Sequence, residues 1–228
     1  MDSIKQAFDL LFSLDKELFQ ILGVTLRMSF FSTSISCLIG LPLGALIGTR
    51  QFRGKSFLKK LIHTWMGLPP VVAGLLVYML FTHYGPFGRL NLLFTVTAMV
   101  IAQCVLITPL VTGLTASFVE TGSRPIIETA RGLGLSDARI VLLCLSEGRA
   151  SLLSVVLNAF GRSIAEVGAV SIVGGNIQWK TRVMTTAIML ETNKGKFSFA
   201  LALGIVLLIL AFIVNAAASW MVKERSDD

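Results

Sequence analysis

Long apolar segments separated by short polar ones set the pattern of this chain. Five segments are apolar over about 20 residues or more, the length that an α-helix needs to cross the hydrocarbon of a bilayer. Three carry no charged side chain, whereas one contains His63 and another contains Arg162 and Glu166. The five segments are residues 28–47, 61–81, 92–119, 150–175 and 197–222. The pattern predicts an all-α polytopic membrane protein with about five transmembrane helices.

The overall composition agrees with this class. Hydrophobic residues make up 54% of the sequence and charged residues only 14%, and the mean hydropathy is +0.77. This balance excludes an ordinary soluble domain. The whole chain, residues 1–228, is therefore expected to form a single transmembrane domain.

The N-terminal residues follow a different pattern. In residues 4–22, apolar side chains recur among Asp and Lys, as in an amphipathic helix that lies along the membrane interface. The basic region, apolar core and cleavage site of a signal peptide are not found here. We therefore expect residues 1–22 to form an interfacial helix ahead of the first span.

Basic residues give the expected orientation in the membrane. The loop 50–60 contains five positive side chains and no acidic one, which indicates a cytoplasmic location. With five spans, residues 119–149 and the C-terminus are then cytoplasmic, while the N-terminus and residues 83–91 and 176–196 lie outside. The net charge of +7 agrees with this distribution and with contacts to anionic lipid, so no nucleic-acid partner is expected.

Glycines and prolines predict two unusual helix contacts. Gly40, Gly44 and Gly48 recur every four residues, so they share one helix face and let a neighbouring backbone approach, most simply within one subunit. Pro69 and Pro70 remove two backbone donors inside a span and exclude regular helix just before them. Free carbonyls at that depth need a protein or water partner. This segment is therefore expected to line either a polar path or a tight helix contact.

Arg162 and Glu166 form the sharpest polar feature inside a span. Their i, i+4 spacing places them on one helix face, within reach of an ion pair. A charge at the centre of a transmembrane helix costs roughly 2.5–3.5 kcal/mol on insertion scales, so both should face protein or water. Two interpretations stay open: a structural pair that joins helices, or a pore-lining pair on the route of a charged solute. We expect the helix to break, and the chain to return to polar surroundings, near Gly174, Gly175 and Asn176.

The loop between the third and fourth spans is long and helix-prone. Ser123 can cap a short helix with Pro125 in its first turn, and Gly134 can end that helix. Ser136 and Asp137 can then start a second helix. Because a connection between two spans does not require such helices, we expect this segment to meet a protein partner.

Motifs for catalysis or for metal binding are not found in the sequence. Cys37, Cys104 and Cys144 have irregular spacing, so they are expected to be buried, reduced side chains, and neither a metal nor a cofactor is expected. The sequence has no His-Glu-x-x-His, no Gly-x-Ser-x-Gly and no nucleotide-binding P-loop. The chain is therefore expected to have no catalytic residues and to hydrolyse no ATP itself.

Several segments together resemble the permease subunits of ABC importers for molybdate, sulfate and tungstate. The likeness covers nearly the whole chain, residues 26–222, and it includes Gly161-Arg-Ser-Ile-Ala-Glu-Val-Gly-Ala169. Residues 85–86 and 97–103 resemble the tungstate branch in particular. The other segments that carry the likeness are residues 68–74, 174–177 and 181–188.

The helix-prone loop carries a further part of this resemblance. Glu128, Ala130 and Gly134 match the first half of the EAA loop, with which permeases of ABC importers dock into their ATPase. The resemblance implies that these three residues and Arg131 couple the chain to an ATPase. The family's loop usually continues to an Ile-x-Leu-Pro ending, whereas this chain has no proline at the equivalent positions, 144–147.

The resemblance implies a type I ABC importer transmembrane domain that acts as a homodimer in the cell membrane. Two copies of a cytoplasmic ATPase and an extracytoplasmic tungstate-binding protein are the implied partners. The dimer would translocate tungstate by alternating access. The candidate residues of the translocation path are Arg162, Glu166, Pro69, Pro70, Gly174, Gly175 and Asn176.

Two other functions stay in view. A molybdate or sulfate permease would share this architecture. The permease sequence does not separate these anions, because the binding protein is expected to select among them. An ion-coupled secondary transporter would also use broken helices and a buried charge pair. Such a carrier has no need of a helical docking loop, and the spans show no inverted repeat.

Overall fold

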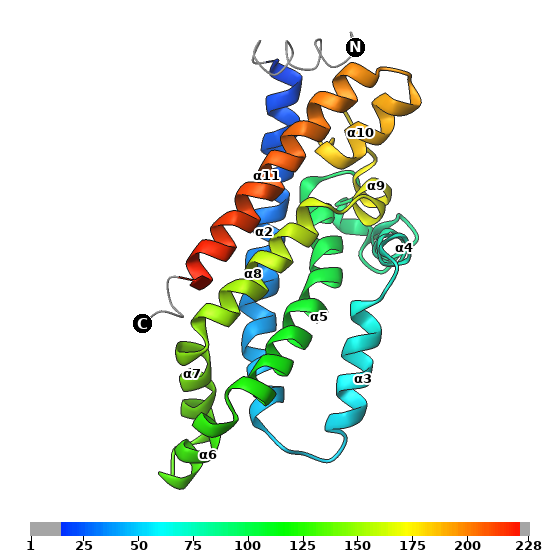
Figure 1. Ribbon diagram of the computed structural model, residues 1–228. Coiled ribbons are helices and arrows are strands. Elements are labelled where there is room, and N and C mark those ends of the chain that lie inside the picture. The colour runs from blue at the N-terminus through cyan, green and yellow to red at the C-terminus, as the bar shows by residue number, and fades with distance from the viewer. Residues whose placement is uncertain (1–14, 224–228) are drawn as a thin grey trace. The chain divides into compact units, whose positions relative to one another are not determined.

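The computed structural model describes residues 15–223, which form helices joined by turns and loops, with no strand among them (Figure 1). The helices keep the labels of Figure 1. They are α2 (Lys16–Thr49), α3 (Lys55–Met66), α4 (Pro70–Phe81), the short 3₁₀ helix η1 (Gly88–Leu90), α5 (Val96–Gly122), α6 (Arg124–Gly132), α7 (Asp137–Glu147), α8 (Arg149–Ile164), α9 (Gly168–Gly174), α10 (Met184–Asn193) and α11 (Phe197–Lys223). The predicted all-α class is confirmed.

Three of the described helices are long and apolar enough to cross a membrane by themselves. They are α2, α5 and the part of α11 from Phe197 to Val214. Two interrupted pairs, α3 with α4 and α7 with α8, each qualify when the two helices count as one broken span. Counted in that way, the described residues hold up to five spans, the expected number, although the α7–α8 pair reaches into residues 119–149, which were expected to be cytoplasmic.

Two of the expected spans are interrupted. Within residues 61–81, α3 ends at Met66 and α4 begins at Pro70, because the two prolines exclude helix in the residues before them. This break was predicted. Within residues 150–175, α8 ends at Ile164 and α9 begins at Gly168, a break that the sequence interpretation did not place.

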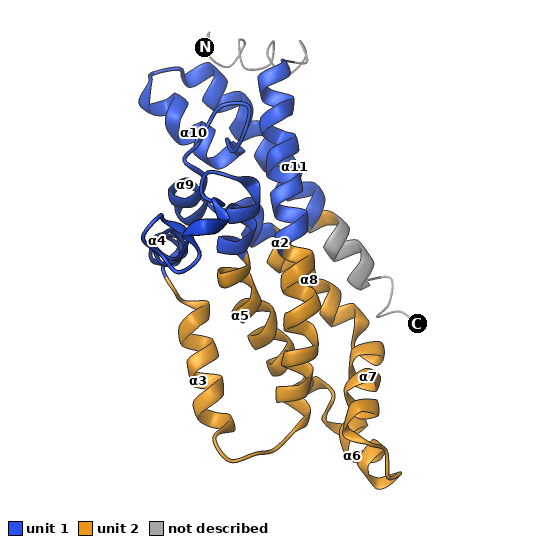
Figure 2. Ribbon diagram, turned by 180° about the vertical axis from the view of Figure 1, so that it is seen from behind, with its two compact units in different colours: residues 1–32, 69–103, 161–214 blue, residues 33–68, 104–160, 215–228 orange. Residues whose placement is uncertain are grey.

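The described chain divides into two compact units (Figure 2). Unit 1 consists of residues 1–32, 69–103 and 161–214, and unit 2 of residues 33–68, 104–160 and 215–228. The division therefore falls inside α2, α5, α8 and α11.

In unit 1, one core cluster joins the start of α2 to α10 and α11. It is formed by Leu18, Ile21, Met184, Ala187, Ala202 and Leu203. Leu18 and Ile21 belong to the segment predicted as an interfacial helix, residues 1–22, and the position of that segment along the membrane interface stays a prediction. Residues from Lys16 onward belong to α2, and Leu18 and Ile21 are buried in protein. Residues 1–14 lie outside the described part of the chain.

In unit 2, the glycine stripe of α2 packs against α5, as expected for a contact within one subunit. A Cβ added at Gly44 would lie 2.6 Å from the carbonyl oxygen of Thr112 and 2.6 Å from the Cβ of Thr115. Added at Gly40 and Gly48, it would meet Val111 and Val119, respectively, within 3 Å. The four-residue repeat therefore allows close approach of the two helices.

We expect Gly44→Ala to destabilise the protein by about 2 kcal/mol, because the new methyl group would overlap the backbone of α5. Gly23→Ala is the matched control on the same helix, since a Cβ at Gly23 has no atom within 4 Å. That control should be neutral or stabilising, as alanine favours helix more than glycine does. Thermal unfolding in detergent measures both variants, and equal stability of the two would contradict the close contact.

Candidate functional site

The predicted docking segment forms two short helices in unit 2, α6 and α7. Ser123 and Ser136 occupy the N-cap positions and Pro125 lies in the first turn of α6, as predicted, although neither serine side chain makes a capping hydrogen bond. Gly134 has a φ of 74°. Its N–H donates to the carbonyl of Arg131 over 3.0 Å, and the Leu135 N–H donates to that of Ala130 over 3.1 Å. Gly134 therefore closes α6 with a left-handed turn that favours glycine.

Two of the four predicted coupling residues hold α6 on unit 2. Ala130 is buried, in a cluster with Ile127 of the same helix and with residues of α2, α5 and α7. The Arg131 Nη2 donates a 2.6 Å hydrogen bond to the carbonyl oxygen of Thr49, at the end of α2. Both residues thus position the segment, because their side chains point back onto the unit.

The other two coupling residues are exposed. Glu128 forms an ion pair of 3.0 Å with Arg124 one turn earlier, and both side chains are largely exposed. Gly134 is exposed, and a Cβ added there would have no atom within 4 Å. Leu133 between the helices is 75% exposed. Sequence analysis missed Arg124 and Leu133, although an apolar residue flanked by two glycines at a predicted turn is a detectable signal.

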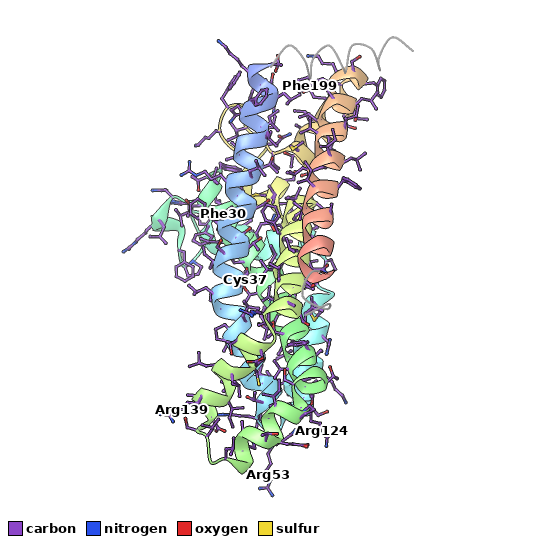
Figure 3. The ribbon with its side chains drawn as sticks, turned by 60° about the vertical axis from the view of Figure 1, so that its left-hand side comes forward. Phe30, Cys37, Arg53, Arg124, Arg139 and Phe199 are labelled. Atoms are coloured by element: carbon purple, nitrogen blue, oxygen red, sulfur yellow. The ribbon has the colours of Figure 1, made fainter. Side chains whose placement is uncertain are left out.

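The first basic loop lies at the same end of unit 2 as this segment. Arg50 and Asp137 form an ion pair of 3.2 Å, which joins the end of α2 to the start of α7. Figure 3 shows the exposed side chains of Arg53, Arg124 and Arg139 at this end. This arrangement agrees with the prediction that residues 50–60 and 119–149 lie on the same side of the membrane.

Glu166 has a different geometry from the one that its spacing predicted. Because α8 ends at Ile164, Glu166 and Arg162 do not share a continuous helix. The Glu166 side chain is 3% exposed, and its Oε1 accepts hydrogen bonds from the N–H groups of Val167 (3.1 Å) and Ala169 (3.3 Å). The carboxylate therefore accepts hydrogen bonds from backbone N–H groups at the start of α9. The i, i+4 spacing could not predict these bonds.

Arg162 remains close to Glu166 but is much more accessible. The distance from its Nη2 to the Glu166 Oε2 is 3.9 Å, and the arginine side chain is 46% exposed. The interaction is therefore weak. The two charges of the predicted pair therefore differ in environment. The Glu166 carboxylate is buried and accepts hydrogen bonds from backbone N–H groups, whereas the Arg162 guanidinium is accessible to solvent.

The double-proline segment leads into a close contact between α4 and α9 in unit 1. A Cβ added at Gly74 would lie 2.6 Å from the Cα of Ala169, and one added at Gly168 would lie 2.9 Å from a methyl group of Val71. Pro70 is the first residue of α4 and also lies against Gly168, whereas Pro69 is exposed. A tight helix contact is therefore present at this segment, and its role in lining a polar path stays a prediction.

The Gly174–Asn176 stretch ends α9 and begins a polar turn, as expected. Gly174 is the buried last residue of α9, and Gly175 and Asn176 have φ values of 69° and 51°. The Thr181 hydroxyl donates to the carbonyl of Gly174 over 2.6 Å, and the Thr186 hydroxyl donates to the Asn176 Oδ1 over 3.0 Å. These threonines, which were not among the predicted residues, fix the turn.

Comparison with known proteins identifies the class to which this arrangement of helices belongs. The sequence pattern of the family described as "Binding-protein-dependent transport system inner membrane component" matches residues 40–226. The chain belongs to this family, and it is an integral membrane protein. The inward-facing MetNI methionine ABC transporter has a similar fold, with a TM-score of 0.69 over 91% of this chain and 95% of that chain at 19% identity. The fold is therefore that of a type I ABC importer transmembrane domain.

Similar curated proteins are known from several organisms. The tungstate uptake system permease protein TupB of Peptoclostridium acidaminophilum is 38% identical over 98% of both chains. Its counterpart in Campylobacter jejuni is 41% identical over 94% of this chain and 90% of that protein. The sulfate transport system permease protein CysT of Escherichia coli is more distant, at 29% identity over 86% of this chain and 75% of that protein.

Proposed function

We propose that this chain is the membrane-spanning permease subunit of an ATP-driven tungstate importer. The observation that carries the proposal is the 38% identity to a tungstate uptake permease over 98% of both chains. Two copies of the chain would form the path, since about five spans cannot readily enclose a route for a tetrahedral dianion. A cytoplasmic ATPase in two copies would supply the energy, and an extracytoplasmic binding protein would deliver the anion. The permease subunit itself would carry out no catalysis.

The α6–α7 segment is proposed as the contact with the ATPase. The buried Ala130 and the bond from Arg131 to the Thr49 carbonyl fix the segment on unit 2. Glu128, Leu133 and Gly134 are exposed and therefore available to a partner. Closure of the ATPase dimer on ATP would push the two segments of the homodimer together and open the cavity outward. Hydrolysis would then restore the inward-facing state.

Arg162 is proposed as the residue of the path that meets the anion. Its side chain is 46% exposed and only loosely paired, so the guanidinium can attract a dianion. Glu166, Pro69, Pro70 and the Gly174–Asn176 turn are proposed to shape the wall by fixing α4 and α9. The site should hold the anion weakly, because a tight site would trap it. Selection among oxyanions then belongs to the binding protein.

The alternatives have less support. Sulfate permeases match at lower identity than the tungstate permeases do. An ion-coupled carrier does not agree with membership in a binding-protein-dependent family.

Cellular uptake tests the proposed substrate. Deleting the gene should abolish high-affinity accumulation of radiolabelled tungstate, and expression of the intact chain should restore it. Excess unlabelled tungstate should compete fully, while equal molybdate and sulfate should compete much less. Unchanged tungstate uptake in the deletion strain, together with lost molybdate or sulfate uptake, would assign a different anion.

Labelling from each side of the membrane tests the proposed orientation, with the N-terminus outside and the C-terminus in the cytoplasm. In a chain without its three native cysteines, Arg53→Cys and Ser136→Cys should react only from the cytoplasmic side. Gly195→Cys should react only from outside. Reaction of positions 53 and 136 from opposite sides would show that the assignment of the spans is wrong.

A further inference from the structure

A basic cavity lies beside α3 in unit 2, apart from the residues proposed for coupling and for the translocation path. Its volume is about 550 Å³. The turn before α3, one flank of α3 and the cytoplasmic end of α5 form its wall. The ionisable residues that line it are Lys55, Lys59, Lys60, His63 and Glu120.

The charge of this cavity is strongly unbalanced. Three lysines against one glutamate leave a formal charge of +2 when His63 is neutral. The first turn of α3 also faces the cavity, through Lys55 and Ser56, and the start of a helix favours negative charge. The cavity therefore offers the charge that complements a doubly negative ligand.

The fold fixes part of this charge in place. Lys55 is only 7% exposed, and its Nζ donates to the carbonyl oxygens of Gly48 (3.3 Å) and Arg50 (2.9 Å). Burying an ammonium group is costly, and these two carbonyls together with Glu120 offset that cost. The Glu120 Oε1 lies 3.4 Å from the Lys55 Nζ. Lys55 is therefore a buried positive charge that its hydrogen bonds and ion pair fix in the wall of the cavity.

Glu120 acts as an internal counterion for one side of the cavity. Its second carboxylate oxygen contacts the Lys59 ammonium, so one carboxylate serves two lysines. Lys60, which follows Lys59 directly, and His63, one turn later in α3, line the cavity and are exposed. They are thus placed to donate hydrogen bonds to a ligand that enters from solvent.

We propose that this cavity is a binding site for a tetrahedral oxyanion. Lys59, Lys60 and His63 would donate to its oxygens, and the Ser56 hydroxyl could provide a further donor. Two sources offer this chemistry, namely the phosphate of an anionic lipid headgroup and a free oxyanion such as phosphate or tungstate. The site does not depend on the proposed function, because it is defined by the charges and donors of α3 and by Glu120 of α5.

Binding to the full-length chain in nanodiscs tests the site and identifies the source of the anion. In neutral phosphatidylcholine nanodiscs at low salt, equilibrium dialysis with radiolabelled phosphate and with radiolabelled tungstate measures the free oxyanions. In detergent, native mass spectrometry measures retained phosphatidylglycerol relative to phosphatidylcholine. Saturable binding in either measurement supports the site. Binding in dialysis identifies a free oxyanion as the ligand, and retention of phosphatidylglycerol identifies a lipid headgroup. Binding should weaken as salt is raised. No saturable binding in either arm would overturn the proposal.

Charge variants show whether the bound anion lies in this cavity. The double variant Lys60→Met and His63→Leu should weaken binding about tenfold, since it removes one charge and two donors. Glu120→Gln should tighten binding about threefold, because it releases Lys55 and Lys59 from their counterion. Arg139→Met removes an exposed cation of α7 that does not line the cavity, and it should have no effect. If the double variant and Arg139→Met lost the same amount of anion affinity, the anion would lie outside this cavity. Weaker anion binding in Glu120→Gln would lead to the same conclusion.

Discussion

Gly134→Trp is expected to abolish association with the ATPase and to lower ATP-dependent uptake at least a hundredfold. Two effects combine at this position. The φ of 74° is strained for any residue with a Cβ, and the indole would project from the exposed turn between α6 and α7. Among the described residues, apart from its two chain neighbours, none has an atom within 4 Å of an added Cβ, so the isolated permease should still accept the bulk. Co-purification of the two subunits measures the loss.

Two variants separate bulk from backbone strain. Gly134→Asn should retain most of the complex, because asparagine adopts the left-handed conformation more readily than other residues. Gly134→Ala introduces the backbone strain without a large side chain, so its yield of the complex should lie between those of Gly134→Trp and Gly134→Asn. Leu133→Ser should weaken the complex about tenfold, since it removes the 75% exposed apolar side chain of the same turn. Normal complex yield from both Gly134→Trp and Leu133→Ser would contradict the assignment of this segment to coupling.

The second large effect is expected at Arg162. Arg162→Met should lower tungstate uptake at least tenfold while complex yield stays normal, because the side chain is 46% exposed and bonded only loosely. Arg162→Lys retains the charge and should keep part of the uptake. Radiolabelled uptake, normalised to the amount of assembled complex, measures both variants.

Glu166 provides the contrast within the same pair. Glu166→Ala leaves the N–H groups of Val167 and Ala169 without their acceptor and should cost about 1–3 kcal/mol of stability, so yield and uptake should fall together. Glu166→Gln still accepts hydrogen bonds and should recover most of the yield. Wild-type uptake from Arg162→Met would remove Arg162 from the path. Normal yield from Glu166→Ala would show that its carboxylate has no structural role.

Patterns that depend on neighbouring residues could be predicted from the sequence. The four-residue spacing of Gly40, Gly44 and Gly48 predicted a close helix contact, and α5 provides it. Pro69 and Pro70 predicted the break between α3 and α4, because proline restricts the backbone before it. Local sterics determine such features, so they are visible without tertiary information.

Features that depend on distant residues or on competing hydrogen bonds could not be predicted in this way. The i, i+4 argument assumed one helix through Arg162 and Glu166, whereas the Glu166 carboxylate binds backbone donors beyond the end of α8. The counterion role of Glu120 also escaped prediction, because its two lysines lie more than 60 residues earlier in the chain. Only the packing of α3 near the end of α5 brings these charges together.

Reconstituted transport shows whether this permease moves tungstate in an ATP-driven complex. Proteoliposomes that contain this permease and its ATPase should accumulate radiolabelled tungstate only when the tungstate-binding protein is present on one side and ATP on the other. A catalytically inactive ATPase is the matched control and should give background accumulation. We expect tungstate to accumulate against a gradient and accumulation to stop when ATP is exhausted. Tungstate uptake that proceeds without ATP or without the ATPase would contradict it.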